Sequence, residues 1–506
     1  MQKLAIEYLL KTKERFPNKI AIVDGEQSIT FFELWKKSLS LAYWITTEFQ
    51  ITNRPISLNL KKSIDAIIAL LAIQLTGNIY VPLDIDTPDK KKEEMLKTLG
   101  SNLVLEHKTG EFILAGKSYS FTYDNNEPDT KNFFLEKLSA RKSSDPLYII
   151  FTSGTTGTPK GVTISNSSVI DYIDWATKTY NVSEKEIIGN QAPLNFDNSV
   201  LDLYLTFAQG CTLHLLSKET LRFPAGFGNY ASSNKINFIF FVPSLLSNFV
   251  ALKIFKDYDL TCLKKILFAG EAMPLNTLKT IRKELPDTLL SNLYGPTEIT
   301  VDAIYWIFGN EMNDLEQVPL GVPCVNHQIL FLDENEKIVT RDNEIAEICV
   351  AGPGVALGYW NDAEMTCLAF IPNPESGKQE EIIYKTGDLG YISNGLIYMT
   401  GRNDDQFKHL GYRIEPGEIE KAINQLEGIQ QSCVIYDSEK KRIIAFYTAE
   451  PMGSPPQFKN LLSTQLPQYM IPHSCHRLDK IPTTRNGKLD RKNLLETKMK
   501  TKNAII

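Results

Sequence analysis

Short apolar runs that end in polar turns recur along much of this chain, and they constrain its fold more than any other feature. Three such runs are Phe238–Val242, Leu263–Phe268 and Leu289–Leu293. Segments with helical periodicity, such as Val200–Gln209, alternate with runs of this kind. This alternation predicts a parallel sheet covered by helices. Because ligands of open α/β sheets bind beyond the carboxyl ends of the strands, we expect the three turns to face a substrate.

The length of the chain predicts more than one domain. It has 506 residues, which is more than a single hydrophobic core usually supports. We expect an α/β fold whose large N-terminal domain, residues 1–401, holds parallel-rich α/β sheets and a small β-rich subdomain. A hinge at 402–404 is predicted to lead into a small, mobile α+β C-terminal domain at 405–496. The polar residues 497–506 are predicted to be a disordered tail.

Local signals predict further elements. Thr30 followed by Glu33 is a capping-box pattern at the start of a helix. The segment Ile64–Leu75 is apolar on almost every side, which predicts a buried helix closed by Gly77. Residues 108–142 are polar and weakly periodic, so we expect a solvated excursion there. Antiparallel strands of the β-rich subdomain are predicted at Ile329–Leu332, Ile345–Val350 and Leu396–Thr400.

Composition and charge exclude several classes of function. A net charge of −6 and a pI near 5.7 lack the basic footprint of nucleic-acid binding and disfavour anionic membranes. The seven cysteines occur singly, which indicates reduced thiols. Residues Met1–Phe16 lack the apolar core of a signal peptide, and the apolar run Ala66–Ile73 is too short to span a membrane. We therefore expect a cytoplasmic protein with no nucleic-acid or membrane partner.

The stretch Ile149–Val162 is predicted to bind an anion. It places three glycines, four threonines and a serine between two apolar runs. Glycine lets backbone N–H groups approach an anion, the hydroxyls add donors, and Lys160 supplies a positive charge. A Walker A loop is excluded because Pro159 precedes this lysine and Gly161 follows it. The alternatives are a polyphosphate-binding loop and a polar surface turn.

Four further motifs follow this loop. They are Tyr294-Gly295-Pro296-Thr297-Glu298, Tyr384-Lys385-Thr386-Gly387-Asp388, the segment Gly401–Glu418 and the segment Pro482–Arg491. Together with the loop they resemble the adenylate-forming (ANL) superfamily, which includes acyl-CoA synthetases, luciferases and the amino-acid adenylation domains of nonribosomal peptide synthesis. The resemblance runs from Thr30 to Arg491, with small departures at Ala346 and Pro416.

The resemblance implies ATP and Mg²⁺ as cofactors. The residues implied in binding them are Thr152, Ser153, Gly154, Thr155, Thr156, Gly157, Lys160, Gly270, Glu271, Tyr294, Gly295, Thr297, Asp388, Arg402 and Lys488. By the same resemblance Tyr294 stacks on adenine, Thr297 contacts phosphate and Asp388 grips the ribose. Glu298 is the implied Mg²⁺ ligand, since this ion prefers one or two carboxylates together with phosphate oxygens.

Four residues carry the implied catalytic roles. They are Glu298, Arg402, Asp404 and Lys488. Arg402 lies near ribose and phosphate in the superfamily, and Asp404 matches the pivot about which the small domain rotates. Lys488 would bridge the substrate carboxylate and the α-phosphate, where it would stabilise the charge that develops as pyrophosphate leaves.

The segment Asn195–Ser199 resembles the part of amino-acid adenylation domains that binds the substrate. Asp197 would pair with the α-ammonium group, a contact that fatty or aryl acids cannot make. The implied side-chain pocket consists of Asn198, Leu201, Ser244, Leu267, Ala269, Leu293, Val301 and Asp302. Its apolar part resembles prolyl carrier-protein ligases, and its polar residues Ser244 and Asp302 favour a small hydroxylated or amine-bearing side chain such as serine. The segment Phe268–Pro274 resembles D-alanyl carrier-protein ligases.

The predicted function is that of a free-standing amino acid–carrier protein ligase. It would activate a small amino acid of the proline, serine or alanine type to aminoacyl-AMP, and then pass it to the phosphopantetheine thiol of a separate carrier protein. An acyl- or aryl-CoA ligase is the first alternative, because it shares the fold. A non-catalytic nucleotide-binding regulatory protein is the second, although it would not need Lys488.

Overall fold

The computed structural model describes residues 3–121, 134, 137–154, 158–309, 312, 315–376, 381–449, 458–482, 489–491 and 494. Its contacts divide the chain into two compact units. The first unit consists of Met1–Ile85, Leu99–Ile150 and Gly161–Asn403, and the second of Asp86–Thr98, Phe151–Lys160 and Asp404–Ile506. The domain and hinge boundaries expected from the sequence stay predictions, and the expected tail at 497–506 lies outside the described residues.

A nine-stranded sheet of the first unit has the order β16-β15-β14-β13-β12-β10-β11-β1-β2. Its strands are β1 (Ile20–Asp24), β2 (Gln27–Thr30), β10 (Ile187–Asn190), β11 (Thr212–Leu215), β12 (Phe238–Phe241), β13 (Lys265–Phe268), β14 (Leu289–Tyr294), β15 (Ile304–Ile307) and β16 (Val322–Pro323). The pairs from β1 through β11, β10, β12 and β13 to β14 are parallel. The three apolar runs singled out in the sequence are therefore neighbouring parallel strands, as expected.

An eight-stranded sheet has the order β19-β9-β8-β4-β3-β5-β6-β7. Its strands are β3 (Pro55–Leu58), β4 (Ile79–Pro82), β5 (Val104–Lys108), β6 (Glu111–Leu114), β7 (Lys117–Tyr119), β8 (Pro146–Thr152), β9 (Lys160–Ser165) and β19 (Gly358–Tyr359). Strands β5, β6 and β7 form an antiparallel meander. The expected solvated excursion at 108–142 is wrong over this part, because Phe112 and Leu114 of β6 are fully buried.

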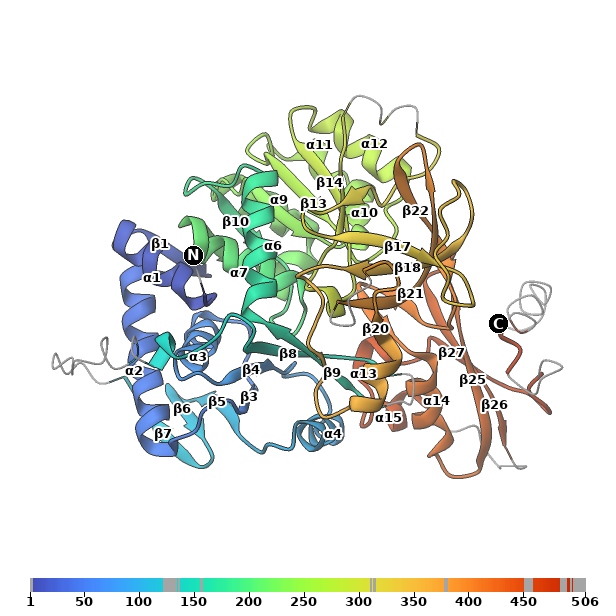
Figure 1. The fold of residues 1–506 in the computed structure, drawn as a ribbon, viewed down its shortest axis with the longest axis horizontal. Helices are drawn as coiled ribbons and strands as arrows, with labels where there is room; N and C mark the ends of the chain where they lie inside the picture. Colours follow the sequence, from blue (N-terminus) through green and yellow to red (C-terminus); the bar gives the residue numbers. More distant parts are fainter. Residues whose placement is uncertain are drawn as a thin grey trace. The chain divides into compact units, whose positions relative to one another are not determined.

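Helices join these two sheets into one buried apolar cluster (Figure 1). The helices that contribute to it are α1 (Ile6–Arg15), α2 (Phe31–Phe49), α3 (Ile64–Leu75), α6 (Asn166–Thr179) and α7 (Asn198–Gln209). Helix α3 is buried at every position except Asp65, as its continuous apolar sequence predicts. Helix α2 begins with the predicted capping box, in which Glu33 N–H donates to Thr30 and the Glu33 carboxylate accepts from Thr30 N–H.

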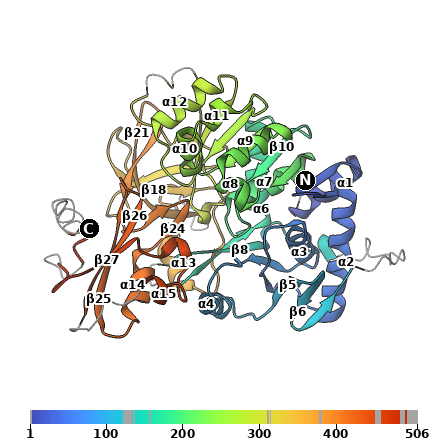
Figure 2. The same ribbon diagram turned by 180° about the vertical axis from the view of Figure 1, so that it is seen from behind.

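A second cluster packs helices against the other face of the nine-stranded sheet (Figure 2). The helices of this region are α8 (Lys218–Arg222), α9 (Pro224–Ser233), α10 (Pro243–Ala251), α11 (Ile254–Asp257) and α12 (Leu275–Glu284). Phe240 of β12 packs in the first cluster and Phe241 in the second, because successive side chains of a strand point to opposite faces. The sheet is therefore buried on both faces, which is typical of α/β proteins.

The β-rich part predicted within the first unit is a five-stranded antiparallel sheet. Its strands are β17 (Gln328–Leu332), β18 (Ala346–Ala351), β20 (Phe370–Pro372), β21 (Ile382–Ser393) and β22 (Leu396–Arg402). Helix α13 (Ala363–Ala369) leads into it, and the short helix η1 (Thr297–Ile299) follows β14. The predicted α/β class with a smaller β-rich part is confirmed, although β21 was not among the predicted strands.

The main part of the second unit is a small α+β body. Its elements are β23 (Phe407–His409), β24 (Tyr412–Ile414), α14 (Pro416–Asn424), β25 (Ile429–Asp437), β26 (Arg442–Ala449), α15 (Phe458–Leu462), η3 (Gln468–Met470) and β27 (Ser474–Arg477). Strands β25 and β26 are antiparallel, and β27 joins β26 in parallel. Ile419 and Ile423 of α14 pack on Val434 and Ala445 of the sheet.

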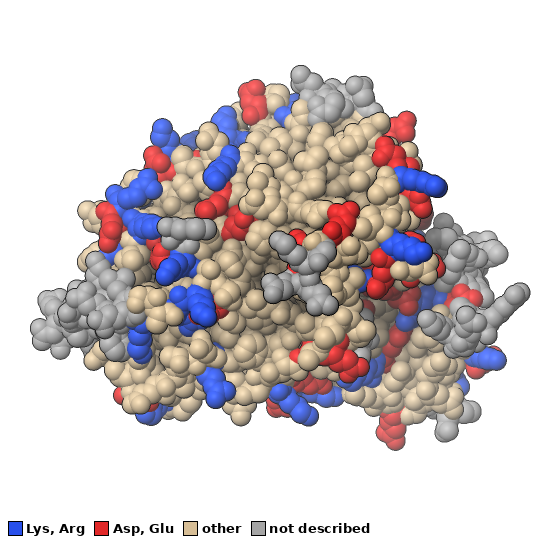
Figure 3. Space-filling view, viewed as in Figure 1, with Lys and Arg blue, Asp and Glu red and all other residues tan. Residues whose placement is uncertain are grey.

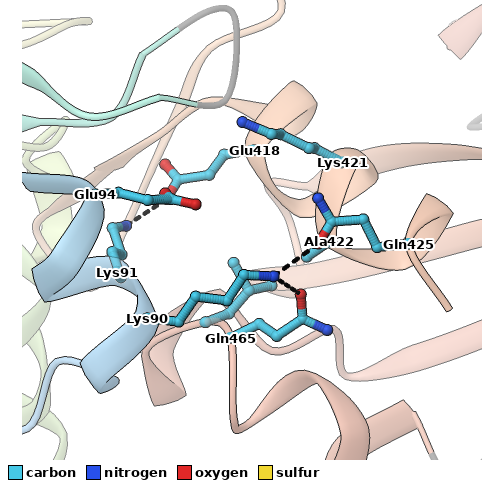
Figure 4. Close-up of a pocket in the computed structure, with 9 residues that line it drawn as sticks. Lys90, Lys91, Glu94, Glu418, Lys421, Ala422, Gln425 and Gln465 are labelled. Carbon is cyan, nitrogen blue, oxygen red and sulfur yellow. Dashed lines mark hydrogen bonds and ion pairs between the residues drawn. The ribbon is translucent and has the colours of Figure 1, made fainter. Parts of the chain in front are cut away.

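Helix α4 (Asp89–Leu99) falls almost entirely in this second unit. Figure 4 shows two of its lysines pointing toward α14. Lys91 forms an ion pair with Glu418, and both side chains are buried. Lys90 donates to Gln425 at 2.9 Å and to Gln465 at 3.0 Å. The charged sequence of α4 therefore does not mark a fully solvated helix.

Three whole-chain expectations can be compared with the structure. All seven cysteines lie in the described ranges, and each is a free thiol. Within those ranges, the helices are all too short or too polar to cross a membrane. On the visible face of the first unit, Lys and Arg side chains are interspersed with Asp and Glu (Figure 3).

Candidate functional site

Asp197 stands immediately before α7, at a position where aspartate often caps a helix. Its side chain makes no capping hydrogen bond to α7. Its Oδ2 atom instead accepts a hydrogen bond of 2.7 Å from the hydroxyl of Thr297. Helix capping therefore does not explain this aspartate, and its carboxylate is oriented by the motif that follows β14.

Glu298 follows in the same motif and is only 1% exposed. Its Oε1 accepts a hydrogen bond of 3.0 Å from the hydroxyl of Tyr359, the last residue of β19. Its backbone carbonyl accepts from the N–H of Ala356 at 2.8 Å. Burying a carboxyl group is costly unless polar partners compensate it, and the Tyr359 hydroxyl is such a partner for Glu298.

The turn after this motif has an unusual backbone. Thr300 and Val301 have φ angles of 60° and 74°, a left-handed conformation that costs a β-branched residue on the order of 1–3 kcal/mol. The Thr300 hydroxyl donates to the Gly354 carbonyl at 2.7 Å, which helps to hold the turn. A Cβ atom on Gly295 would lie 2.2 Å from the Val301 carbonyl oxygen. Glycine is therefore required at position 295, and the turn brings Val301 and its neighbour back toward β14.

Tyr294 and Asp388 meet at the boundary between β14 and the five-stranded sheet. The Tyr294 hydroxyl donates to Asp388 Oδ2 at 2.5 Å. Arg402, which is in register with Asp388 across β21 and β22, forms an ion pair with its Oδ1. Burial, and then the charge of Asp388, raise the pKa of Tyr294 well above its usual value, so the tyrosine remains a hydrogen-bond donor.

The eight residues of the predicted side-chain pocket all belong to the first unit and lie within the described ranges. Five of its residues belong to one buried cluster of the first unit, namely Leu201, Leu267, Ala269, Leu293 and Val301. Asn198 begins α7, and Ser244 is the second residue of α10. Asp302 is 1% exposed and accepts a hydrogen bond of 2.7 Å from the Tyr172 hydroxyl. Because of this bond, Asp302 also has a structural partner, which the sequence did not predict.

Gly270 and Glu271 form the turn after β13. Gly270 has a φ angle of 93°, which favours glycine. The Glu271 carboxylate accepts a hydrogen bond of 2.9 Å from the backbone N–H of Ser244. The turns after β12 and β13 are thus linked to each other, as expected for neighbouring strands whose carboxyl ends share one edge.

The loop Phe151–Lys160 clusters with the second unit. Thr152 ends β8 and Lys160 begins β9. The Ser153 hydroxyl donates to the Arg413 carbonyl at 2.8 Å. A Cβ atom on Gly154 would lie 1.9 Å from the Thr158 carbonyl oxygen, so only glycine is tolerated there. The predicted phosphate ligands Thr155, Thr156 and Gly157 lie outside the described residues.

The two remaining catalytic candidates belong to the second unit. Asp404 accepts a hydrogen bond of 3.2 Å from the N–H of Gln406. The side chain of Gln406 in turn donates to Glu415 and accepts from Arg413. Lys488 lies outside the described residues.

The residues of the first unit are compatible with a nucleotide and Mg²⁺. Among the described residues, no cluster of three or more His, Cys, Asp or Glu side chains forms a self-contained metal site. The buried carboxylate of Glu298 fits the preference of Mg²⁺ for one or two carboxylates together with phosphate oxygens. Asp388 already accepts two hydrogen bonds, but a carboxylate offers about four acceptor positions, so it can also accept from a sugar hydroxyl.

Asp202, one turn inside α7, is a buried acid that the sequence did not single out. It is 0% exposed and accepts a hydrogen bond of 2.8 Å from the Asn190 amide. Burial raises its pKa to about 7, although this hydrogen bond and the charge of Lys62 act in the opposite direction. The one sequence signal for this buried acid is an aspartate among the apolar residues of α7.

This pKa predicts a pH-dependent stability. Because the pKa is raised on folding, the contribution of Asp202 is fully present below about pH 4 and is lost as the pH rises through about 7. Between pH 5 and pH 8 the wild type should lose about 3 kcal/mol more than Asp202→Asn, which cannot ionise. Urea unfolding of both proteins at the two pH values measures this difference. Parallel loss in both would contradict the assignment.

Two solved structures that share this fold contain adenylation domains. The Vibrio cholerae adenylation domain AlmE, in complex with glycyl-adenosine-5'-phosphate, has a TM-score of 0.85 at 19% identity, covering 99% of this chain and 98% of that one. PA1221, a nonribosomal peptide synthetase protein containing adenylation and PCP domains, has a TM-score of 0.81 at 22% identity, covering 99% and 98%. At these identities the similarity shows the fold.

Sequence comparison shows the family. The profile of the AMP-binding enzyme family matches residues 9–360, and that of the AMP-binding enzyme C-terminal domain matches residues 418–488. The chain therefore belongs to the family of AMP-binding enzymes, the adenylate-forming ligases, and the resemblance inferred from its motifs is confirmed.

Three relatives illustrate its place in this family. Zwittermicin A synthase ZmaJ of Bacillus cereus is 32% identical, with 97% of this chain and 94% of that protein covered. D-alanine–D-alanyl carrier protein ligase of Bacillus cytotoxicus is 30% identical, with 97% and 98% covered. Tyrocidine synthase 1 of Brevibacillus parabrevis is 31% identical over 96% of this chain, which spans 44% of the length of that protein.

Proposed function

We propose that this enzyme is an amino acid–carrier protein ligase. It activates a small amino acid with ATP to aminoacyl-AMP and pyrophosphate, and transfers the aminoacyl group to the phosphopantetheine thiol of a carrier protein in the cytoplasm. The observation that carries the proposal is the Asp197 carboxylate, which does not cap α7 and is oriented by Thr297. The similarity to a D-alanine–D-alanyl carrier protein ligase supports the same reading.

In the first half-reaction, Asp197 accepts hydrogen bonds from the α-ammonium group of the substrate. The apolar cluster around Leu201 and Leu267 limits the size of the side chain. A carboxylate oxygen of the amino acid attacks the α-phosphorus of ATP, and the bond to pyrophosphate breaks. Tyr294 and Asp388 hold the nucleoside, Glu298 would hold Mg²⁺ on the phosphates, and Lys488 stabilises the developing negative charge.

In the second half-reaction, the thiol sulfur attacks the acyl carbon of the adenylate. The thiol loses its proton, AMP leaves, and a thioester forms. Rotation of the second unit about the proposed pivot at Asp404 would bring different residues of this unit to the substrate in the two half-reactions. Arg402, two positions before Asp404, belongs to the first unit together with its ion-pair partner Asp388.

Pyrophosphate exchange across the proteinogenic amino acids, their D-forms and several carboxylic acids tests the proposal. We expect exchange with one or a few small amino acids, and thioester formation when a phosphopantetheinylated carrier protein is added. Turnover of a carboxylic acid with free CoA, and none with amino acids, would instead identify an acyl- or aryl-CoA ligase. Binding of ATP with no exchange at all would favour a regulatory protein.

Substituting Asp404 with proline tests the pivot. Proline fixes its own φ angle and restricts the residue before it, so the variant should keep pyrophosphate exchange within about threefold and lose thioester formation by about 100-fold. Asp404→Ala, which retains backbone freedom, is the matched control. Normal rates in both half-reactions of the proline variant would contradict the pivot.

A further inference from the structure

Lys62 connects the two large sheets of the first unit. It lies in the loop between β3 and α3 and reaches the end of β10. Its ammonium donates to the side-chain oxygen of Asn190 at 3.0 Å and to the backbone carbonyl of the same residue at 3.1 Å. It also donates to the carbonyls of Gln191 at 3.2 Å and Ala192 at 3.5 Å. One ammonium group therefore holds three consecutive carbonyls of a single backbone segment.

The contact continues from β10 into α7. The Asn190 amide nitrogen donates to Asp202 at 2.8 Å, and Asn190 is only 1% exposed. In the described part of the chain, the second oxygen of Asp202 has no hydrogen-bond partner. Lys62, Asn190 and Asp202 are called the Lys62 network below. Burial lowers the pKa of Lys62 to about 8, while the negative charges of Asp202 and Asp24 raise it, so the lysine still carries its charge near neutral pH.

The Lys62 network holds both sides of the segment that presents Asp197. Residues 191–197 begin at the carbonyls bound by Lys62 and end where α7 begins. Helix α7 is held in turn through Asp202. Because a short segment fixed at both ends has few alternative conformations, the position of the Asp197 carboxylate depends on Lys62, although the two side chains make no direct contact among the hydrogen bonds described here.

We propose that Lys62 is a positioning residue for amino-acid recognition, which fixes the segment carrying Asp197 by binding its carbonyls. This inference rests on the proposed function, in which Asp197 binds the substrate ammonium. If Lys62 only stabilised the fold, its substitution would not change the KM for the amino acid more than the KM for ATP. The separate effects on the amino acid and on ATP therefore distinguish positioning from general stability.

The test compares Lys62→Met with the wild type in pyrophosphate exchange, using the proteinogenic amino acid that gives the fastest exchange. Methionine keeps an unbranched, flexible side chain that is one heavy atom shorter, and it removes the charge. We expect the KM for the amino acid to rise by about tenfold or more, and the KM for ATP to change by less than about twofold. Lys62→Arg, which keeps a positive donor group, should recover most of the loss. Lys61→Met, at the exposed neighbouring position, is the matched control.

Three results would overturn the inference. They are an unchanged KM for the amino acid, an equal rise in both KM values, and a similar effect of Lys61→Met. If Lys62→Met does not fold, the double variant Lys62→Met with Asp202→Asn removes both buried charges and carries the same measurement. A wild-type enzyme that shows no amino-acid-dependent exchange would contradict the proposed function itself, before any variant is compared.

Discussion

Replacing Lys488 by alanine is expected to lower amino-acid-dependent pyrophosphate exchange by about 100- to 1,000-fold, the usual effect of removing one group that stabilises a transition-state charge. Thioester formation from pre-made aminoacyl-AMP should stay within about threefold of the wild type, because the transfer of the adenylyl group is already complete. The two half-reactions are measured separately, by isotope exchange and by loading of a carrier protein.

The control for this prediction is Lys480→Ala, since Lys480 belongs to the same unit and is exposed. It should leave both half-reactions unchanged. Equal loss of both half-reactions in Lys488→Ala, with normal thermal unfolding, would show that this lysine is not specific to adenylation. Equal loss with lowered thermal stability would show a structural role instead, and would likewise contradict the assignment.

Features that depend on local chemistry could be predicted from the sequence. The capping box at Thr30 and the largely buried helix Ile64–Leu75 appear at the predicted residues. The apolar runs ending at Val242, Phe268 and Leu293 correspond to the parallel neighbours β12, β13 and β14. Helix capping and apolar periodicity are decided by residues a few positions apart, so these patterns already contain the required information.

Features that depend on distant contacts could not be predicted. Asp302 is bound by Tyr172, 130 positions earlier, and Glu298 by Tyr359, 61 positions later. The left-handed backbone at Thr300 and Val301 contradicts the preference of β-branched residues, and it is stabilised by tertiary contacts such as that with Gly354. Local sequence patterns cannot predict these contacts, because each contact forms only between residues that the complete fold brings together.

The meander of β5, β6 and β7 shows a different limit. Its polar residues suggested a solvated segment, yet Phe112 packs against His107 and Phe121. Short strands with one buried face contribute few apolar residues to the sequence, so their period-two signal is weak. In β6 the buried Phe112 and Leu114 flank Ile113, which is also apolar, so the sequence does not alternate there between apolar and polar residues.

Asp197→Asn is expected to lower kcat/KM for the preferred amino acid by about 100-fold, because a buried carboxylate–ammonium pair that loses one charge costs about 2–5 kcal/mol. For the substrate analogue that lacks the α-amino group, kcat/KM should be the same in both proteins, because this analogue has no ammonium group to pair with Asp197. The structure indicates that this substitution changes the charge without disturbing the fold. Asp197 makes no side-chain capping bond to α7, and asparagine can still accept the hydrogen bond from Thr297.

The fold should therefore survive the substitution, and the loss should appear only with substrates that carry the amino group. Asp287→Asn, at an exposed position of the same unit, is the control for the change of charge and should leave exchange unaltered. If Asp197→Asn slows the amino acid and its des-amino analogue equally, Asp197 does not recognise the ammonium group. The specificity for amino acids would then have to reside elsewhere, with Asp302 the next acid to substitute, since it is buried next to the same apolar cluster.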